Sequence, residues 1–151
     1  MAIELATQVR ISRPAQTVFT ELTALDRWPE WLVASGIRSV ELLDGRPLGT
    51  GSALRIRQEA AGRTATIDAT VTLLEPPMRF ALTGRDADGI TTEIEARIGQ
   101  DGPIAVVDWR VVVKLPLRLR MFEGLAAPQL RKAVYLDLEA FRRRLESVAH
   151  D

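Results

Sequence analysis

The sequence predicts an α+β fold, in which an antiparallel sheet is covered on one face by a long C-terminal helix. Between residues 37 and 115, short apolar segments are separated by turns rich in Gly, Asp and Pro, which is typical of strands joined by hairpins. After Pro116, apolar residues recur every three or four positions up to about residue 148, which predicts an amphipathic helix. Hairpin connections make a sheet antiparallel, and such a sheet can bury one face under a helix.

The first part of the chain predicts one strand followed by two short helices. Residues 3–11 alternate apolar and polar side chains, as a half-buried strand does. Pro14 precedes apolar residues at helical spacing, and proline is favoured where a helix begins. Trp28 and Trp31 lie three positions apart, so they share one face of the second short helix.

Six more strands and the closing helix complete the prediction. The strands are placed at residues 37–43, 51–59, 64–74, 78–85, 91–99 and 104–115. Within the closing helix, Pro128 cannot donate a backbone hydrogen bond, so a kink or break is expected there. Residues 117–127 then form either a lid over a pocket or one arm of a static kink, and the sequence leaves both open.

The turns also predict which residues pair across the sheet. Tight turns would pair Ile56 with Ile67, Leu73 with Phe80, and Ile94 with both Leu82 and Trp109. With these pairs, all the turns place the apolar side chains on one common face of the sheet.

Bulky residues on this inner face alternate with Ala, Gly and Thr, which we interpret as an apolar cavity beneath the helix. The alternative is that the helix packs closer to the sheet there. The predicted ligand-binding residues are Leu54, Ile56, Gln58, Ile67, Ala69, Val71, Phe80, Leu82, Thr92, Ile94, Ala96, Val107, Trp109, Val111, Phe122, Leu125, Leu130 and Val134.

Few polar residues are candidates for a chemical role. Gln58 and Thr92 are predicted to face inward, where either could hydrogen-bond a ligand, although an ordered water would satisfy Gln58 equally well. Asp68 and Asp108 could form an acid–base pair, but the predicted register places both on the solvated outer face, with Glu93 opposite Arg110. No catalytic residue is assigned.

Composition excludes several classes of site. The 151 residues include 20 basic and 20 acidic side chains, so no general attraction to nucleic acid or to an anionic membrane is expected. There is no Cys, and the single His, His150, is next to the last residue, which argues against thiol or histidine catalysis and against a metal site. No cofactor is predicted, because no glycine-rich phosphate loop opens a helix. We expect one domain over residues 1–151, a cytoplasmic location and no integral membrane association; the oligomeric state is left open.

Several segments resemble one known superfamily along essentially the whole chain. They are Arg13–Phe19 (RPAQTVF), Leu25–Trp31 (LDRWPEW), Leu48–Ser52 (LGTGS), Val71–Pro77 (VTLLEPP) and Phe141–Glu146 (FRRRLE). The chain is similar to the START-like (SRPBCC, Bet v 1-like) proteins, also described as the polyketide cyclase/dehydrase and lipid-transport superfamily. The resemblance implies a helix-grip fold: a seven-stranded antiparallel sheet wrapped around a long C-terminal helix, with an apolar pocket between them.

Three functions are compatible with this resemblance. The first is binding of a small hydrophobic ligand, such as a lipid, quinone, polyketide or other aromatic compound. The second is a cyclase or dehydratase that uses acid–base residues other than His. The third is a protein-interaction module. Fold alone does not decide among them.

Overall fold

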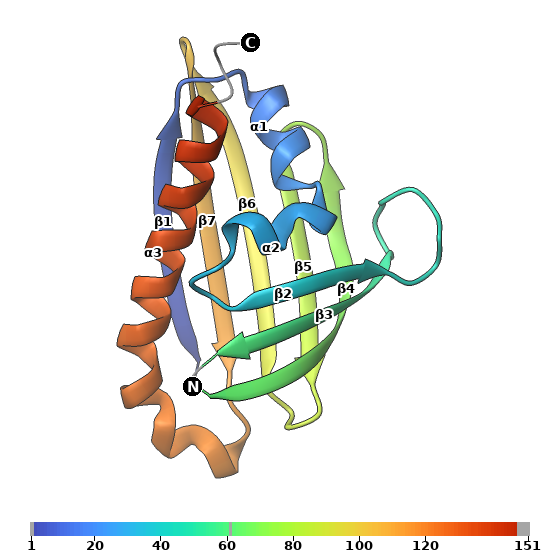
Figure 1. Ribbon diagram of the computed structural model, residues 1–151, viewed down its shortest axis with the longest axis vertical. Coiled ribbons are helices and arrows are strands. Elements are labelled where there is room, and N and C mark those ends of the chain that lie inside the picture. The colour runs from blue at the N-terminus through green and yellow to red at the C-terminus, as the bar shows by residue number, and fades with distance from the viewer. Residues whose placement is uncertain (1, 61, 148–151) are drawn as a thin grey trace.

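The computed structural model describes residues 2–60 and 62–147 (Figure 1). His150 lies outside the described residues. The elements in chain order are β1 (Ile3–Ile11), α1 (Ala15–Leu22), η1 (Leu25–Arg27), α2 (Trp28–Trp31), β2 (Ile37–Leu42), β3 (Ala53–Ala60), β4 (Arg63–Glu75), β5 (Arg79–Asp86), β6 (Thr91–Asp101), β7 (Ile104–Lys114), η2 (Leu117–Phe122) and α3 (Glu123–Ser147), where η marks a 3₁₀ helix. The predicted α+β order of elements is confirmed.

The seven strands form one antiparallel sheet in the order β1-β7-β6-β5-β4-β3-β2. Figure 1 shows all the helices on the same side of this sheet, with α3 running along β1 and β7 and α2 lying over the central strands. The helices therefore cover the concave face, and the opposite face is open to solvent. This is the helix-grip arrangement that the resemblance implied.

Helix α3 differs from the prediction at Pro128. The helix continues through this proline without a break, and the change of helix type falls at Glu123, where η2 ends. Pro128 still lacks the N–H that would bond to the carbonyl of Gly124, so the first turns of α3 have one backbone hydrogen bond fewer than the later ones.

Two of the four predicted strand pairs are confirmed, where the turn residues fix the register. Ile56 pairs with Ile67, and Leu82 pairs with Ile94. Between β4 and β5 the prediction was wrong: Leu74, not Leu73, pairs with Phe80, since a bulge shifts the register between Val71 and Leu73.

The pairing of β6 with β7 also differs, by two residues. Trp109 pairs with Ala96 rather than with Ile94, because the turn consists of Gly102 and Pro103. A proline has no N–H for the ladder and belongs in the turn, and Gly102 supplies the positive φ of 58° that the turn requires.

A shift of two residues keeps every side chain on its predicted face, since the period of a strand is two. The predicted cross-strand pair changes, however. Glu93 lies opposite Val112, and Arg110 lies opposite Glu95.

Five aromatic rings join the helices to the sheet. Trp31 of α2 lies 4.5 Å from Phe141 of α3 and 5.7 Å from Trp109 of β7, measured between ring centroids. Trp28 meets Phe80, Trp109 and Trp31 edge-on at about 6 Å. All five side chains are at most 2% exposed. We call these five residues the aromatic cluster; it fills the interior beneath the second half of α3.

Ion pairs fasten the C-terminal half of α3 to the other helices. Arg144 Nε lies 3.0 Å from a carboxylate oxygen of Glu21 on α1, and Arg144 Nη1 lies 2.9 Å from one of Glu30 on α2. Arg13 Nη2 donates to the backbone carbonyl of Glu146 at 2.8 Å.

Small residues on the concave face do not all leave space. A Cβ added at Gly84 would lie 2.6 Å from Ile67 Cγ2 and 3.2 Å from Ala69 Cβ, so its cross-strand neighbours already occupy the position. The expected hollow at Gly84 is therefore absent, because the twist of the sheet brings β4 side chains over β5.

The Gly84→Ala substitution is expected to destabilise the fold by about 1–3 kcal/mol, because the added methyl overpacks this contact. Urea denaturation would measure it. Gly99→Ala on β6 is the matched control, since a Cβ there has no neighbour within 4 Å. Equal stability of the two variants would contradict close packing at Gly84.

Candidate functional site

The concave face is closed at one end and partly exposed at the other. Rows of paired residues cross β4 to β7, and the row containing Phe80, Ala96 and Trp109 is at most 2% exposed. The next two rows contain Ile94 and Thr92, which are half-buried although they face inward. Their neighbours in these rows, Leu82, Val111 and Val113, are at most 8% exposed.

Helix α3 shows the same gradient in exposure. Leu130 is half-buried, Val134 is 6% exposed, and Leu138 and Phe141 are at most 1% exposed. Together these gradients define an accessible apolar surface at one end of the concave face. We call Ile67, Thr92, Ile94 and Leu130 the open end.

The predicted ligand-binding residues fall into three groups. The buried ones are Leu54, Ile56, Ala69, Val71, Phe80, Leu82, Ala96, Val107, Trp109, Val111 and Val134. The half-buried ones are Gln58, Ile67, Thr92, Ile94 and Leu130. Phe122 and Leu125 differ from the rest, because they lie on η2 and the first turn of α3 with 49% and 73% of their surface exposed. Their role in a ligand site stays a prediction.

Gln58 has a partner within the protein. Its Nε2 donates to the backbone carbonyl of Ser35 at 2.8 Å, and the N–H of Glu59 donates to the carbonyl of Gly36 at 2.8 Å. Gly36 has a φ of 77°, and a Cβ there would lie 1.9 Å from the carbonyl oxygen of Glu59. The loop between α2 and β2 is thus pressed against β3, and only glycine fits at its closest point.

Asp137 is a buried carboxylate that the sequence analysis missed. One carboxylate oxygen accepts from the N–H of Ala34 at 2.8 Å, and the other accepts from the N–H of Ser35 at 3.1 Å and from the Ser35 hydroxyl. Asp137 is 1% exposed. The sequence did contain a signal, since Asp137 lies three residues after Val134 and four before Phe141, on the apolar stripe of the helix.

Burial raises the pKa of the Asp137 carboxyl above its ordinary value, although the Ser35 hydroxyl and the two backbone N–H groups act in the opposite direction. The loop between α2 and β2 is therefore held from both sides, by β3 through Gln58 and by α3 through Asp137.

Trp31 places a hydrogen-bond donor in the apolar interior. Its side chain is 1% exposed, and its Nε1 has no acceptor among the described residues. By contrast, Nε1 of Trp28 donates to the carbonyl of Leu22 at 2.8 Å. A buried N–H without an acceptor costs about 1–3 kcal/mol.

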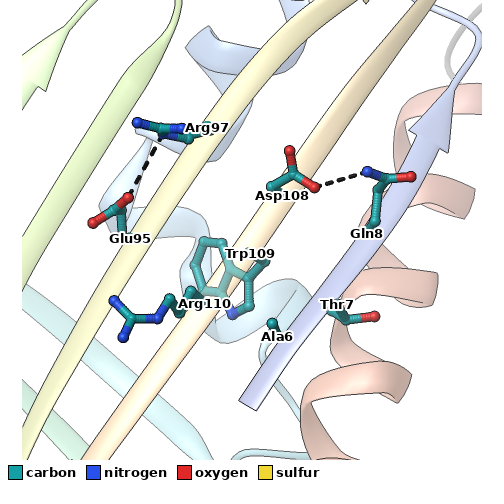
Figure 2. Close-up of a pocket in the computed structure, with 8 residues that line it drawn as sticks. All are labelled: Ala6, Thr7, Gln8, Glu95, Arg97, Asp108, Trp109 and Arg110. Atoms are coloured by element: carbon teal, nitrogen blue, oxygen red, sulfur yellow. Dashed lines mark hydrogen bonds and ion pairs between the residues drawn. The ribbon is translucent and has the colours of Figure 1, made fainter. Parts of the chain in front are cut away.

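Two surface hollows lie elsewhere. One, of about 410 Å³, is on the outer face of the sheet (Figure 2). There Gln8 Nε2 donates to Asp108 at 2.8 Å, and Arg97 lies 3.8 Å from Glu95. Arg110, which also lines it, lies 3.1 Å from Glu4, so most charged groups here are paired on the outer face, and the predicted outward position of Asp108 is confirmed.

The other hollow, of about 220 Å³, lies between η1 and strands β2 and β3, with Leu25, Leu42 and Leu54 among its lining residues. Neither hollow lies beneath α3. Asp68 also faces outward, with an oxygen 3.5 Å from Arg55 Nε. It lies on β4, and Asp108 lies on β7 with two strands between them, so the two do not form an acid–base pair.

Within residues 2–60 and 62–147, no cluster of three or more Asp, Glu, His or Cys side chains has the spacing to hold a metal ion. None of the described helices is long and apolar enough to cross a membrane.

A sheet that grips a long C-terminal helix, with an apolar concave face between them, defines the helix-grip class of proteins. The chain belongs to the polyketide cyclase / dehydrase and lipid transport family, whose model matches residues 2–146. A comparison of the sequence with curated proteins finds no match.

Solved structures share this fold at low sequence identity. The protein TTHA0849 from Thermus thermophilus is 15% identical, with a TM-score of 0.77 over 97% of this chain and 99% of that one. A START superfamily protein from Mycobacterium smegmatis is 18% identical, with a TM-score of 0.75 and coverage of 97% and 99%. The Zhui aromatase/cyclase from a Streptomyces species is 16% identical, with a TM-score of 0.73 and coverage of 99% and 94%. These similarities establish the fold.

The Asp137→Asn substitution tests the protonation of the buried carboxyl. Because burial raises the pKa of Asp137 above 3.8, the folded protein binds this proton more tightly than the unfolded chain does. The wild type therefore loses stability from this group as pH rises from 3.8 through the folded pKa, and the variant does not. Relative to wild type, the variant should become more stable as pH rises from about 3 to about 7, as measured by chemical denaturation across that range. The opposite slope would mean that the ionised carboxylate is the stabilised form.

Proposed function

We propose that the protein binds a small hydrophobic ligand, with at least one oxygen that accepts a hydrogen bond, at the open end of the concave face. The observation that carries this proposal is the exposure gradient. Ile67 and Ile94 face inward and remain half-buried, beside the buried Leu82 and Val111, while Phe80, Ala96 and Trp109 in the next row are at most 2% exposed. A concave apolar surface with few polar groups is the usual form of a small-molecule site.

The ligand class follows from the lining. Aliphatic side chains at the open end and aromatic rings behind it suit a flat or chain-like apolar molecule, such as a quinone, polyketide or lipid. Trp31 offers the buried donor, so a carbonyl or carboxyl oxygen would orient the guest against the aromatic cluster.

The geometry favours binding over acid–base catalysis. A cyclase or dehydratase needs an ionisable group directed at its substrate. Two described carboxylates are buried, and both are engaged within the protein. The oxygens of Asp137 accept hydrogen bonds from Ala34 and Ser35. The Asp86 side chain, opposite Ile67, is 6% exposed and lies 3.0 Å from Arg63. It accepts hydrogen bonds from the N–H groups of Asp88 and Ile90.

The Ile94→Phe substitution should weaken binding of menadione, a naphthoquinone, by about tenfold or more, because the larger ring occupies part of the open end. Quenching of tryptophan fluorescence would measure binding, since Trp31 and Trp109 lie behind the site. Met78→Phe, at a side chain 56% exposed in the β4–β5 turn, is the matched control.

An Ile94→Phe variant that folds normally and binds menadione as well as wild type would contradict the position of the site. Wild-type protein that binds neither menadione nor dodecanoic acid would contradict the function.

The Trp31→Phe substitution tests the proposed donor, because it removes Nε1 and keeps an aromatic ring. Affinity for menadione should fall by about 3- to 10-fold, the equivalent of one neutral hydrogen bond, relative to affinity for 1-methylnaphthalene, which has no oxygen. The ratio of the two affinities cancels any loss of packing. An unchanged ratio would show that the indole N–H does not contact the quinone.

A further inference from the structure

Large apolar side chains are exposed together where η2 meets α3. Leu117, Met121 and Leu125 are 80%, 79% and 73% exposed, and Phe122 is 49% exposed. Single exposed apolar residues are normal on a protein surface, and Val33, Leu43 and Met78 are of this kind, on three separate loops and turns. Four within nine residues form a patch, and such patches mark interaction sites. We call these four residues the apolar patch.

Basic side chains accompany the apolar patch. Residues 117–132 contain four basic residues, Arg118, Arg120, Arg131 and Lys132, and one acidic residue, Glu123, for a net charge of plus three in a chain whose total is zero. Arg118 is engaged by Asp88, with its Nη2 2.7 Å from the backbone carbonyl and 3.8 Å from the carboxylate. Within the part of the chain that the structure describes, the other three basic residues have no carboxylate within 4 Å.

The segment is placed where a flat partner can reach it. Figure 1 shows η2 and the first turns of α3 at the lower end of the molecule, at one extreme of its long axis. A surface that approaches this end meets the segment that carries the apolar patch and the basic residues.

We propose that residues 117–132 dock the protein reversibly on an anionic lipid surface. The apolar patch would enter the boundary between headgroups and acyl chains, and Arg120, Arg131 and Lys132 would face lipid phosphates. Exposed apolar side chains flanked by Arg and Lys are the combination that binds at such interfaces.

A second copy of the chain fits this surface less well. A two-fold dimer places the same surface of both copies face to face, so Arg120, Arg131 and Lys132 of one copy would oppose those of the other. An anionic lipid surface instead complements that charge. The docking does not depend on the proposed ligand function, because the apolar patch faces solvent and the open end faces the interior.

Flotation with lipid vesicles tests the proposal. Full-length protein should float with vesicles of phosphatidylcholine and phosphatidylglycerol in equal parts, and not with phosphatidylcholine alone. The bound fraction should fall as salt is raised, because salt screens the charges. Leu117→Gln combined with Met121→Gln should weaken binding by about tenfold or more, since two of the most exposed apolar side chains are lost. Arg120→Gln combined with Lys132→Gln should weaken binding to the anionic vesicles.

The matched control is Val33→Gln combined with Met78→Gln, at side chains 62% and 56% exposed but outside the patch. Its flotation should equal that of wild type. A tryptophan at the patch, from Phe122→Trp, should shift its emission to shorter wavelength only with anionic vesicles. Circular dichroism melting would show that each variant folds.

Three results would overturn the proposal. Wild-type protein would not float with anionic vesicles, or the patch variant would float as well as wild type. The third is that the protein is a dimer in solution and that Leu117→Gln combined with Met121→Gln makes it a monomer. Menadione binding measured on the same samples separates the two proposals. Loss of flotation with intact menadione binding would contradict only the docking proposal. Loss of menadione binding with intact flotation would contradict only the ligand proposal.

Discussion

Packing among five aromatic rings holds the helices of this fold to the sheet. Trp28 and Trp31 come from a helix of only four residues, which could not persist without tertiary contacts. Their rings lie between Phe80 and Trp109 on the sheet and Phe141 on α3. The aromatic cluster therefore fills one end of the concave face and leaves the half-buried residues at the other end.

Polar contacts set the position of the short helices around the cluster. Asp137 binds the backbone of Ala34 and Ser35, and Gln58 binds the carbonyl of Ser35, so the loop that follows Trp31 is fixed to both α3 and β3. This explains why a carboxylate is tolerated on the buried stripe of α3: its lone pairs satisfy backbone groups that would otherwise be buried without partners.

The order of elements could be predicted because each depends on local sequence signals. Turn residues set the register of the hairpins. Pro103 accounts for the misplaced pair between β6 and β7, because it moves the turn one residue along the chain. The bulge after Val71 has no such local marker. The filling of the concave face was less predictable, because Ala69, Gly84 and Ala96 look like space in a list of side chains. Whether that space is vacant depends on the twist of the sheet and on the positions of the aromatic rings of α2. Both depend on contacts between residues far apart in the sequence.

The candidate site was predicted in part for the same reason. Inward-facing residues of the strands follow from period two, and the structure places them on one face. Asp137 was overlooked although it interrupts an apolar stripe, and the orphan N–H of Trp31 depends on neighbours far away in the chain. Phe122 and Leu125 fit the helical period of the closing segment, but they lie on η2 and on the first turn of α3, where both side chains are exposed.

The two halves of α3 are secured unequally. Arg144 and Arg13 tie its last turns to α1, α2 and the end of β1, whereas the turns around Pro128 lack a backbone hydrogen bond and carry side chains that face water. Local unfolding should therefore start at Glu123 and stop before Phe141. Backbone amides near residue 126 would exchange their hydrogens with solvent sooner than those near residue 142, while the rest of the molecule keeps its native packing.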